Sequence, residues 1–95
     1  MFALSRMEAV SVSPCVYVLK CEDDCWYVGI THNLNFRLGQ HFGGSGSKWT
    51  KLHKPLELVE VIYPGTREME NSKTKALMAE FGDKVRGGSW CKIEN

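Results

Sequence analysis

Alternating apolar and polar positions predict two short strands near the start of the chain. Residues 15–21 (CVYVLKC) and 25–30 (CWYVGI) are rich in Val, Ile, Tyr and Trp, and residues 22–24 (EDD) between them are typical of a tight turn. Together they predict a β-hairpin. Period-two alternation puts Tyr17 and Tyr27 on one face of their strands, so a hairpin would direct both phenols into a shared space.

The segment THNLNFRLGQHF that follows has apolar residues at helical spacing and predicts a helix that ends at the Gly-Gly of residues 43–44. Thr31 or Asn33 is a suitable N-cap. Arg37 and His41 are four residues apart, so we expect them on the same side of this helix, one turn from each other.

The stretch GGSGSKWTKLHKP (43–55) is expected to be a flexible, basic loop, and residues 56–63 (LELVEVIY) are expected to form a third strand. A second helix is predicted from about Arg67 to Phe81, with Thr66 as N-cap and Gly82 as a C-terminal cap in the left-handed conformation.

Glu70 shares a face of this second helix with Thr74, Leu77 and Phe81, so a carboxylate lies at the edge of a stripe that faces the core. In the tail, the apolar residues within 90–93 suggest a short additional strand. The chain is therefore expected to be an α/β (α+β) domain of order β-β-α-β-α. Its three-stranded, mainly antiparallel sheet would be flanked by helices, with residues 1–13 as an N-terminal extension and 14–95 as the domain.

Composition is consistent with one globular domain, because 95 residues with 43% apolar and 24% charged side chains support a single modest core. No window is apolar enough to span a membrane and no signal peptide is recognisable, so we expect an intracellular protein. In a reducing compartment the four cysteines are expected to be free thiols. A structural zinc site that uses Cys21 and Cys25 is the less favoured alternative.

The net charge of +1 does not by itself suggest nucleic-acid binding, but the charges are unevenly distributed. Residues 31–55 contain no Asp or Glu, whereas they contain Arg37, Lys48, Lys51, Lys54 and three histidines. This segment could follow a phosphate backbone locally, although an ordinary solvated surface would show the same pattern.

The tripeptides Cys15-Val16-Tyr17 and Tyr27-Val28-Gly29, the following Ile-Thr, the phrase NLNFRLGQH and the loop GSGSKWTKLHKP together resemble the GIY-YIG nuclease family. The resemblance extends from about residue 14 to residue 90. It implies a small stand-alone nuclease domain that hydrolyses DNA phosphodiester bonds with one divalent ion, Mg²⁺ or Mn²⁺. The resemblance also implies duplex or branched DNA as the binding partner and a role in DNA repair or recombination. A protein partner could supply specificity for the substrate.

Carried over position by position, the resemblance assigns catalytic roles to Tyr17, Tyr27, Arg37 and His41. It assigns the metal-binding glutamate to Glu70, with Glu80 as the rival. The sequence departs from the family pattern at Lys84, where some members have a polar residue such as Asn.

Hydrolysis of a phosphodiester needs an activated water and neutralisation of the charge that develops on phosphate. Arg37 would bind the transition state, and Tyr17 would accept the proton of the attacking water or orient it, beside Tyr27. A phenol that acts as a base at neutral pH requires a depressed pKa. His41 would relay the proton or hold a phosphate.

Lys48, Lys51 and Lys54 are expected to contact the DNA backbone without reading sequence, and Trp49 to stack on a base. No motif dedicated to sequence recognition is present, so low sequence specificity or recognition of DNA structure is expected. The alternative functions are a catalytically inactive nucleic-acid-binding module of the same fold and a partner-binding module.

Overall fold

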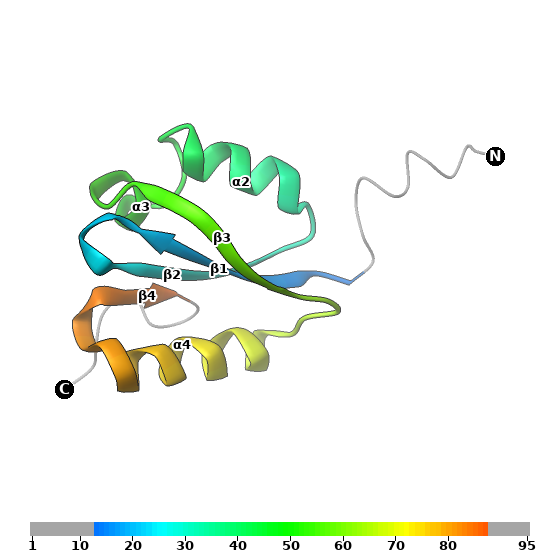
Figure 1. Ribbon diagram of the computed structural model, residues 1–95. Helices are drawn as coiled ribbons and strands as arrows, with labels where there is room; N and C mark the ends of the chain where they lie inside the picture. The colour runs from blue at the N-terminus through cyan, green and yellow to red at the C-terminus, as the bar shows by residue number, and fades with distance from the viewer. Residues whose placement is uncertain (1–12, 88–95) are drawn as a thin grey trace.

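The computed structural model describes residues 13–87 of the 95-residue chain (Figure 1). The elements follow in this order: strand β1 (Cys15–Cys21), the 3₁₀ turn η1 (Glu22–Asp24), strand β2 (Trp26–Thr31), helix α2 (Leu34–Phe42), helix α3 (Lys48–Leu52), strand β3 (Pro55–Ile62), helix α4 (Arg67–Phe81), the 3₁₀ turn η2 (Gly82–Lys84) and strand β4 (Val85–Gly87). The predicted order β-β-α-β-α is present, and α3 and β4 are additional to it.

Within residues 13–87 the sheet has four strands in the order β3-β1-β2-β4, so the prediction of three strands is wrong. Strand β1 is antiparallel to both β2 and β3, and the short strand β4 runs parallel to β2 from Trp26 to Val28. Three residues that end in glycine give no periodic signal, which explains why the sequence pattern did not predict β4. The strand expected within residues 90–93 lies outside the described part of the chain.

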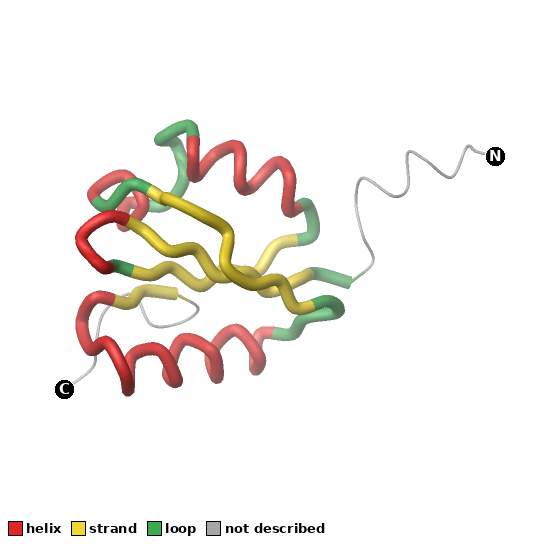
Figure 2. Tube along the Cα trace, in the orientation of Figure 1, coloured by secondary structure: helices red, strands yellow, loops and turns green. Residues whose placement is uncertain are grey.

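The sheet separates two layers of helices. Helices α2 and α3 lie over one face and α4 lies over the other (Figures 1 and 2). The predicted alternation of β1 is confirmed, because Tyr17 and Leu19 belong to the core cluster that contacts α2 and α3, whereas Val16 and Val18 belong to the cluster on the α4 face. The hairpin thus places the phenols on the α2 face.

Local hydrogen bonds explain where the helices begin. The side chain of Asn33 accepts from the backbone N–H of Phe36 at the start of α2, and Thr66 accepts in the same way from Met69 at the start of α4. Gly82 ends α4, as predicted, but with φ 67° and ψ −136°, so the predicted left-handed helical conformation of this cap is not present.

The expectation of a flexible loop over residues 43–55 is wrong in its second half, where helix α3 forms. Ser47 caps this helix by accepting from the backbone N–H of Thr50. Trp49 is packed against the core, and its indole N–H donates to the carbonyl of Trp26 at 2.9 Å. One capped turn fixed by a partly buried aromatic residue is too short to produce a helical period in the sequence.

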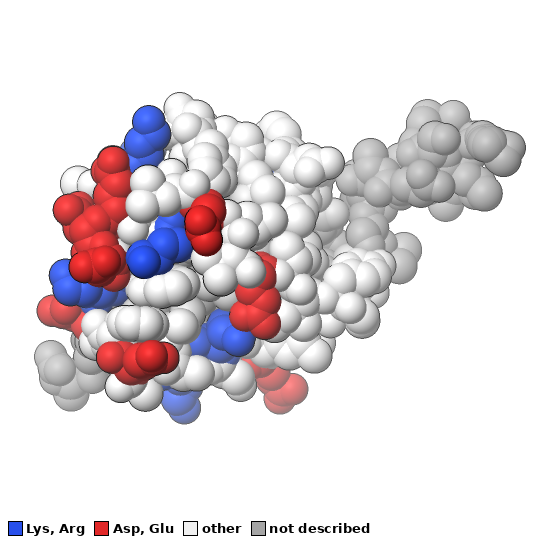
Figure 3. Space-filling view, in the orientation of Figure 1, with Lys and Arg blue, Asp and Glu red and all other residues white. Residues whose placement is uncertain are grey.

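Charged residues of both signs are interspersed near the β1–β2 turn on the face that Figure 3 shows, whereas the area over α2 carries few charges. Exposed apolar side chains are concentrated on the edge strand β3, where Leu56, Leu58, Val59 and Val61 lie at the surface. Within residues 13–87, no helix has the length and apolar character needed to cross a bilayer.

Cys15, Cys21 and Cys25 are buried free thiols, as expected, while Cys91 lies outside the described residues. Burial raises the pKa of Cys21 to about 12, which keeps this thiol protonated. In the described part of the chain, no group of three His, Cys, Asp or Glu side chains is arranged to hold a metal ion. The structure therefore gives no support to the alternative of a zinc site.

Candidate active site

The two tyrosines lie on adjacent strands and point to the same face of the sheet. Tyr17 on β1 is paired with Gly29 on β2, and Leu19 is paired with Tyr27, so the two rings are diagonal neighbours. Their centroids are 6.3 Å apart. Gly29 has a steric role here, because a Cβ at this position would overlap the hydroxyl and ring of Tyr17. The missing side chain leaves space for the Tyr17 phenol above β2.

Helix α2 brings His41 and Arg37 to these phenols. His41 is completely buried, and its Nε2 lies 2.8 Å from the hydroxyl of Tyr17. Its ring also contacts Tyr27, with centroids 4.9 Å apart. Arg37, one turn earlier, interacts with the hydroxyls of both tyrosines. Residues from β1, β2 and α2 therefore form one cluster, as the sequence predicted.

A chain of hydroxyls fixes the tautomer of His41. Nδ1 of His41 lies 3.0 Å from Oγ1 of Thr50, and that hydroxyl donates to the carbonyl of Ser47 at 3.1 Å. The hydroxyl of Ser47 also lies 3.1 Å from Oγ1 of Thr50 and can donate to it, whereas the carbonyl of Ser47 can only accept. We therefore assign the proton of Thr50 to this carbonyl, and with that assignment Nδ1 of His41 carries a proton and donates it to Thr50. Nε2 then accepts from the hydroxyl of Tyr17. The phenolic proton of Tyr17 is thus directed at His41 and its oxygen lone pairs face elsewhere.

Electrostatics favour the neutral forms of this pair. Burial is the main cause that raises the pKa of Tyr17 above its ordinary value; Tyr27 and Glu70 raise it further and Arg37 opposes them. The protein's own groups therefore raise the pKa of Tyr17, whereas a phenolate base would need a depressed one. Burial, assisted by the charge of Arg37, lowers the pKa of His41 to about 4. Burial also disfavours the charged form of Arg37, but its interactions with Tyr17 and Tyr27 outweigh this and raise its pKa.

Glu70 lies in the first turn of α4, where its side chain is buried and only 5% of the residue is exposed. Its Oε1 is 3.6 Å from Nη1 of Arg67. The negative charge of Glu70 contributes to raising the pKa of Tyr17, as the weakest of the causes, whereas Glu80 does not contribute. Glu80 is exposed near the other end of α4. Of the two glutamates that the sequence suggested, Glu70 is the one associated with the cluster.

The residues present are suitable for a hard divalent cation. Ions of this class prefer carboxylate and water oxygens and are often held by one or two carboxylates with the substrate phosphate. Glu70 supplies a buried carboxylate beside the tyrosine cluster. Water and the substrate phosphate would provide the remaining ligands of such an ion.

The basic residues of the 43–55 segment fall into two groups. Lys48 and Trp49 line a pocket of about 450 Å³ that reaches Tyr27. Lys51 and Lys54 line a separate hollow that reaches His41 and Thr50 from the opposite side of α3. Of the four predicted nucleic-acid contacts, therefore, only Lys48 and Trp49 line a pocket that also contains a tyrosine of the site.

Lys84 stands near the point where some family members have a polar residue after the second helix. Its Nζ donates to the carbonyl of Asp23 at 3.4 Å, on the exposed side of η2. Lys84 therefore stabilises the β1–β2 turn and is not part of the tyrosine cluster.

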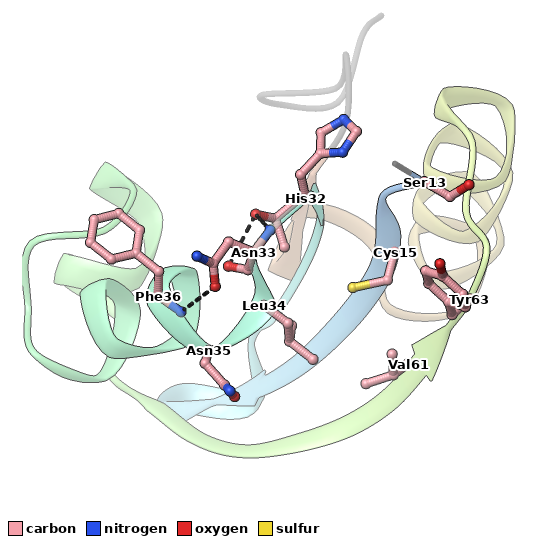
Figure 4. Close-up of a pocket in the computed structure, with 10 residues that line it drawn as sticks. Ser13, Cys15, His32, Asn33, Leu34, Asn35, Phe36, Val61 and Tyr63 are labelled. Atoms are coloured by element: carbon pink, nitrogen blue, oxygen red, sulfur yellow. Dashed lines mark hydrogen bonds between the residues drawn. The ribbon is translucent and has the colours of Figure 1, made fainter. Parts of the chain in front are cut away.

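A second hollow, of about 690 Å³, lies between the start of α2 and the end of β3, on the other flank of α2 (Figure 4). Leu34, Phe36, Val61 and Tyr63 contribute apolar walls to it. It shares no residue with the tyrosine cluster, so its size does not make it a candidate active site.

Two groups in the site were not predicted from the sequence. Thr50 positions His41, and Arg86 places its guanidinium over the ring of Trp49 with Cζ 4.2 Å from the ring centroid. Neither is marked by a motif. Both become neighbours of the site only because α3 and β4 form, and those two elements were absent from the prediction.

Comparison with known proteins gives the same family as the residues. A family model described as the GIY-YIG catalytic domain matches residues 13–77. The UPF0213 protein YazA of Bacillus subtilis is 38% identical over 65 residues, which cover 68% of this chain and 60% of YazA. A UPF0213 protein of Staphylococcus haemolyticus is 38% identical over 66 residues, covering 70% of this chain and 73% of that protein. No solved structure gives a significant match. The printed names of these relatives state no activity.

Proposed function

Because the chain belongs to the GIY-YIG catalytic-domain family, whose members are nucleases, we propose that it is an endonuclease that hydrolyses DNA phosphodiester bonds with one divalent metal ion. The observation that supports this proposal most directly is the convergence of four side chains from three elements. Tyr17, Tyr27, Arg37 and His41 contact one another although they are spread over 25 positions of sequence, from 17 to 41. Two phenols, a guanidinium and an imidazole with a defined tautomer are suited to phosphoryl chemistry.

Tyr17 and His41 act as a pair in this proposal. The oxygen of Tyr17 accepts a proton from the attacking water while its own proton passes to Nε2 of His41, 2.8 Å away. The water oxygen forms its bond to phosphorus as the bond from phosphorus to the 3′ oxygen breaks. The concerted transfer avoids a free phenolate, which the raised pKa of Tyr17 makes unfavourable. It places a transient positive charge on His41, whose own pKa is lowered to about 4, and the negative charge that develops on the phosphate offsets that charge. Thr50 keeps Nε2 unprotonated before the reaction.

Arg37 binds the non-bridging oxygens, which gain negative charge in the transition state. Its planar guanidinium is always charged and can donate two parallel hydrogen bonds to phosphate. Tyr27 contacts the His41 ring and interacts with the guanidinium, so it holds both groups in position. A divalent ion held by Glu70 would supply Lewis-acid stabilisation of the leaving oxygen.

The test is metal-dependent cleavage of supercoiled and branched DNA by matched variants. Arg37→Ala is expected to lower kcat by about 10²- to 10³-fold with a smaller change in DNA affinity, because its interaction is strongest in the transition state. Glu70→Gln is expected to abolish cleavage at low metal concentration. Glu80→Gln is the control at an exposed position of the same helix and should cleave like the wild type.

Binding of DNA by the wild type without nicks in Mg²⁺ or Mn²⁺ would contradict the proposal and support a catalytically inactive binding module. Loss of cleavage in Glu80→Gln with normal cleavage in Glu70→Gln would instead reassign the metal ligand.

A further inference from the structure

Apart from Tyr27, the residues that line the pocket between α3 and β4 have no role in the steps above, although the pocket opens beside the proposed active site. Its walls come from Tyr27, Trp49, Leu52, Arg86 and Gly87, with Lys48 at its rim, and its volume is about 450 Å³. Among the described residues 13–87, no acidic side chain lines it. An apolar, aromatic pocket with two cationic side chains complements a ligand that has both a flat ring and a negative charge.

The aromatic wall is held rigidly. The indole of Trp49 is oriented by its hydrogen bond to the carbonyl of Trp26 and packs against His53, with ring centroids 4.5 Å apart. The guanidinium of Arg86 lies over the ring of Trp49. Its orientation is held by hydrogen bonds from Nη1 to the carbonyls of Asp83 and Val85, each at 2.9 Å. Little side-chain entropy is lost when a planar group stacks on such a preformed surface.

We infer that this pocket receives an unstacked nucleobase next to the scissile phosphate, because Tyr27 is shared between the pocket and the tyrosine cluster and Arg86 presents a planar surface over Trp49. The inference rests on the proposed nuclease function. A base inside a regular duplex is paired and stacked, so it cannot enter the pocket without being extruded. The preferred substrate class is therefore DNA with an unpaired nucleotide at the cleavage site, such as a flap, a bulge or a branch point.

The experiment measures the affinity of the full-length protein, in EDTA and at fixed salt, for two oligonucleotide junctions. They differ only in whether the unpaired nucleotides carry bases or are abasic. The wild type is expected to bind the junction with bases about tenfold to a hundredfold more tightly, if a base on the Arg86 guanidinium over Trp49 gains as much as in ordinary base stacking. Equal affinities would overturn the inference.

Two leucine variants test whether the pocket causes the difference. Leu52 is 66% exposed in the pocket wall, so Leu52→Glu adds a negative charge there with little effect on folding. It is expected to remove the preference for bases. Leu56→Glu is the matched control, since Leu56 is 57% exposed on β3, outside the pocket. A preference that persists in Leu52→Glu would place base recognition elsewhere and overturn the assignment.

Cleavage of the same junctions in Mg²⁺ separates this inference from the proposed function. Cleavage of both junctions with equal affinities would leave the nuclease proposal intact and refute the pocket. A preference for bases without any cleavage would refute the nuclease proposal, and the pocket would remain as a nucleobase-binding site.

Discussion

The closest packing in the site is between Gly29 and Tyr17, and it can be tested by adding one methyl group. In Gly29→Ala the new Cβ would overlap the hydroxyl and Cζ of Tyr17 and would lie 2.8 Å from its Cε2. These are ring atoms of a residue that is only 1% exposed, so no flexible end of a side chain is available to move aside. The ring or the strand has to shift.

The cost can be estimated from the two consequences of this shift. Overpacking in a dense core typically destabilises by about 1–3 kcal/mol. If the Tyr17 ring moves, Nε2 of the buried His41 loses its donor, and a buried polar atom left without its partner costs about 1–3 kcal/mol more. We therefore expect Gly29→Ala to lower the free energy of unfolding by about 2–5 kcal/mol and to reduce cleavage, because the same movement separates Tyr17 from His41.

Urea denaturation and a nicking assay measure these two effects. Gly39→Ala is the control, because Gly39 is exposed within α2 and a Cβ there meets no atom within 4 Å. That variant should be stabilised by about 0.5–1 kcal/mol through helix propensity. In a Tyr17→Leu background the effect of Gly29→Ala should become much smaller, since the clashing ring is gone. If Gly29→Ala matches the wild type in stability and cleavage, the packing argument is refuted.

Three further predictions concern individual side chains. His41 binds a proton near pH 6.5 in the unfolded chain but only near pH 4 in the native state, so the free energy of unfolding should decrease by up to about 3 kcal/mol as the pH falls between these values. Denaturation measured at several pH values should show this dependence in the wild type and a flatter one in His41→Asn. Thr66→Ala removes the N-cap of α4 and should cost about 1 kcal/mol by urea denaturation, whereas a change below about 0.2 kcal/mol would show that the cap contributes nothing. If Lys51 contacts a phosphate, Lys51→Ala should reduce the slope of log affinity against log salt by about 1, and an unchanged slope would exclude that contact.

The residues that form the core of the site could be predicted because their positions follow from short periods. Alternation along β1 and β2 puts Tyr17 and Tyr27 on one face whatever the rest of the fold, and helical spacing puts Arg37 and His41 on one side of α2. The N-caps at Asn33 and Thr66 and the glycine cap at Gly82 follow from equally local chemistry. The resemblance to a family then connected these local features into one site.

Features that depend on tertiary contacts could not be predicted. Helix α3 has five residues and strand β4 has three, so neither completes enough periods to be recognised. A phenolate base at Tyr17 would require a depressed pKa, whereas the environment of the phenol raises it. The effect of burial on this pKa outweighs the opposing effect of Arg37, because the phenol is enclosed beneath α2. How deeply a side chain is buried cannot be predicted from the spacing of residues in the sequence.

The position of α4 on the sheet distinguishes Glu70 from Glu80 as the candidate metal ligand, a choice that the sequence left open. Helix α4 lies on the face opposite the phenols, so a carboxylate on it can reach them only past an edge of β2. Within residues 13–87, β4 covers that edge from Trp26 to Val28 and leaves it uncovered from Gly29 onward. The C-terminal end of α4 is fixed at the covered end, because Phe81 stacks on Trp26 with centroids 5.1 Å apart. Ten residues of helix span about 15 Å, so the first turn of α4, which carries Glu70, lies at the uncovered end. This geometry favours Glu70 over Glu80 as the proposed metal ligand.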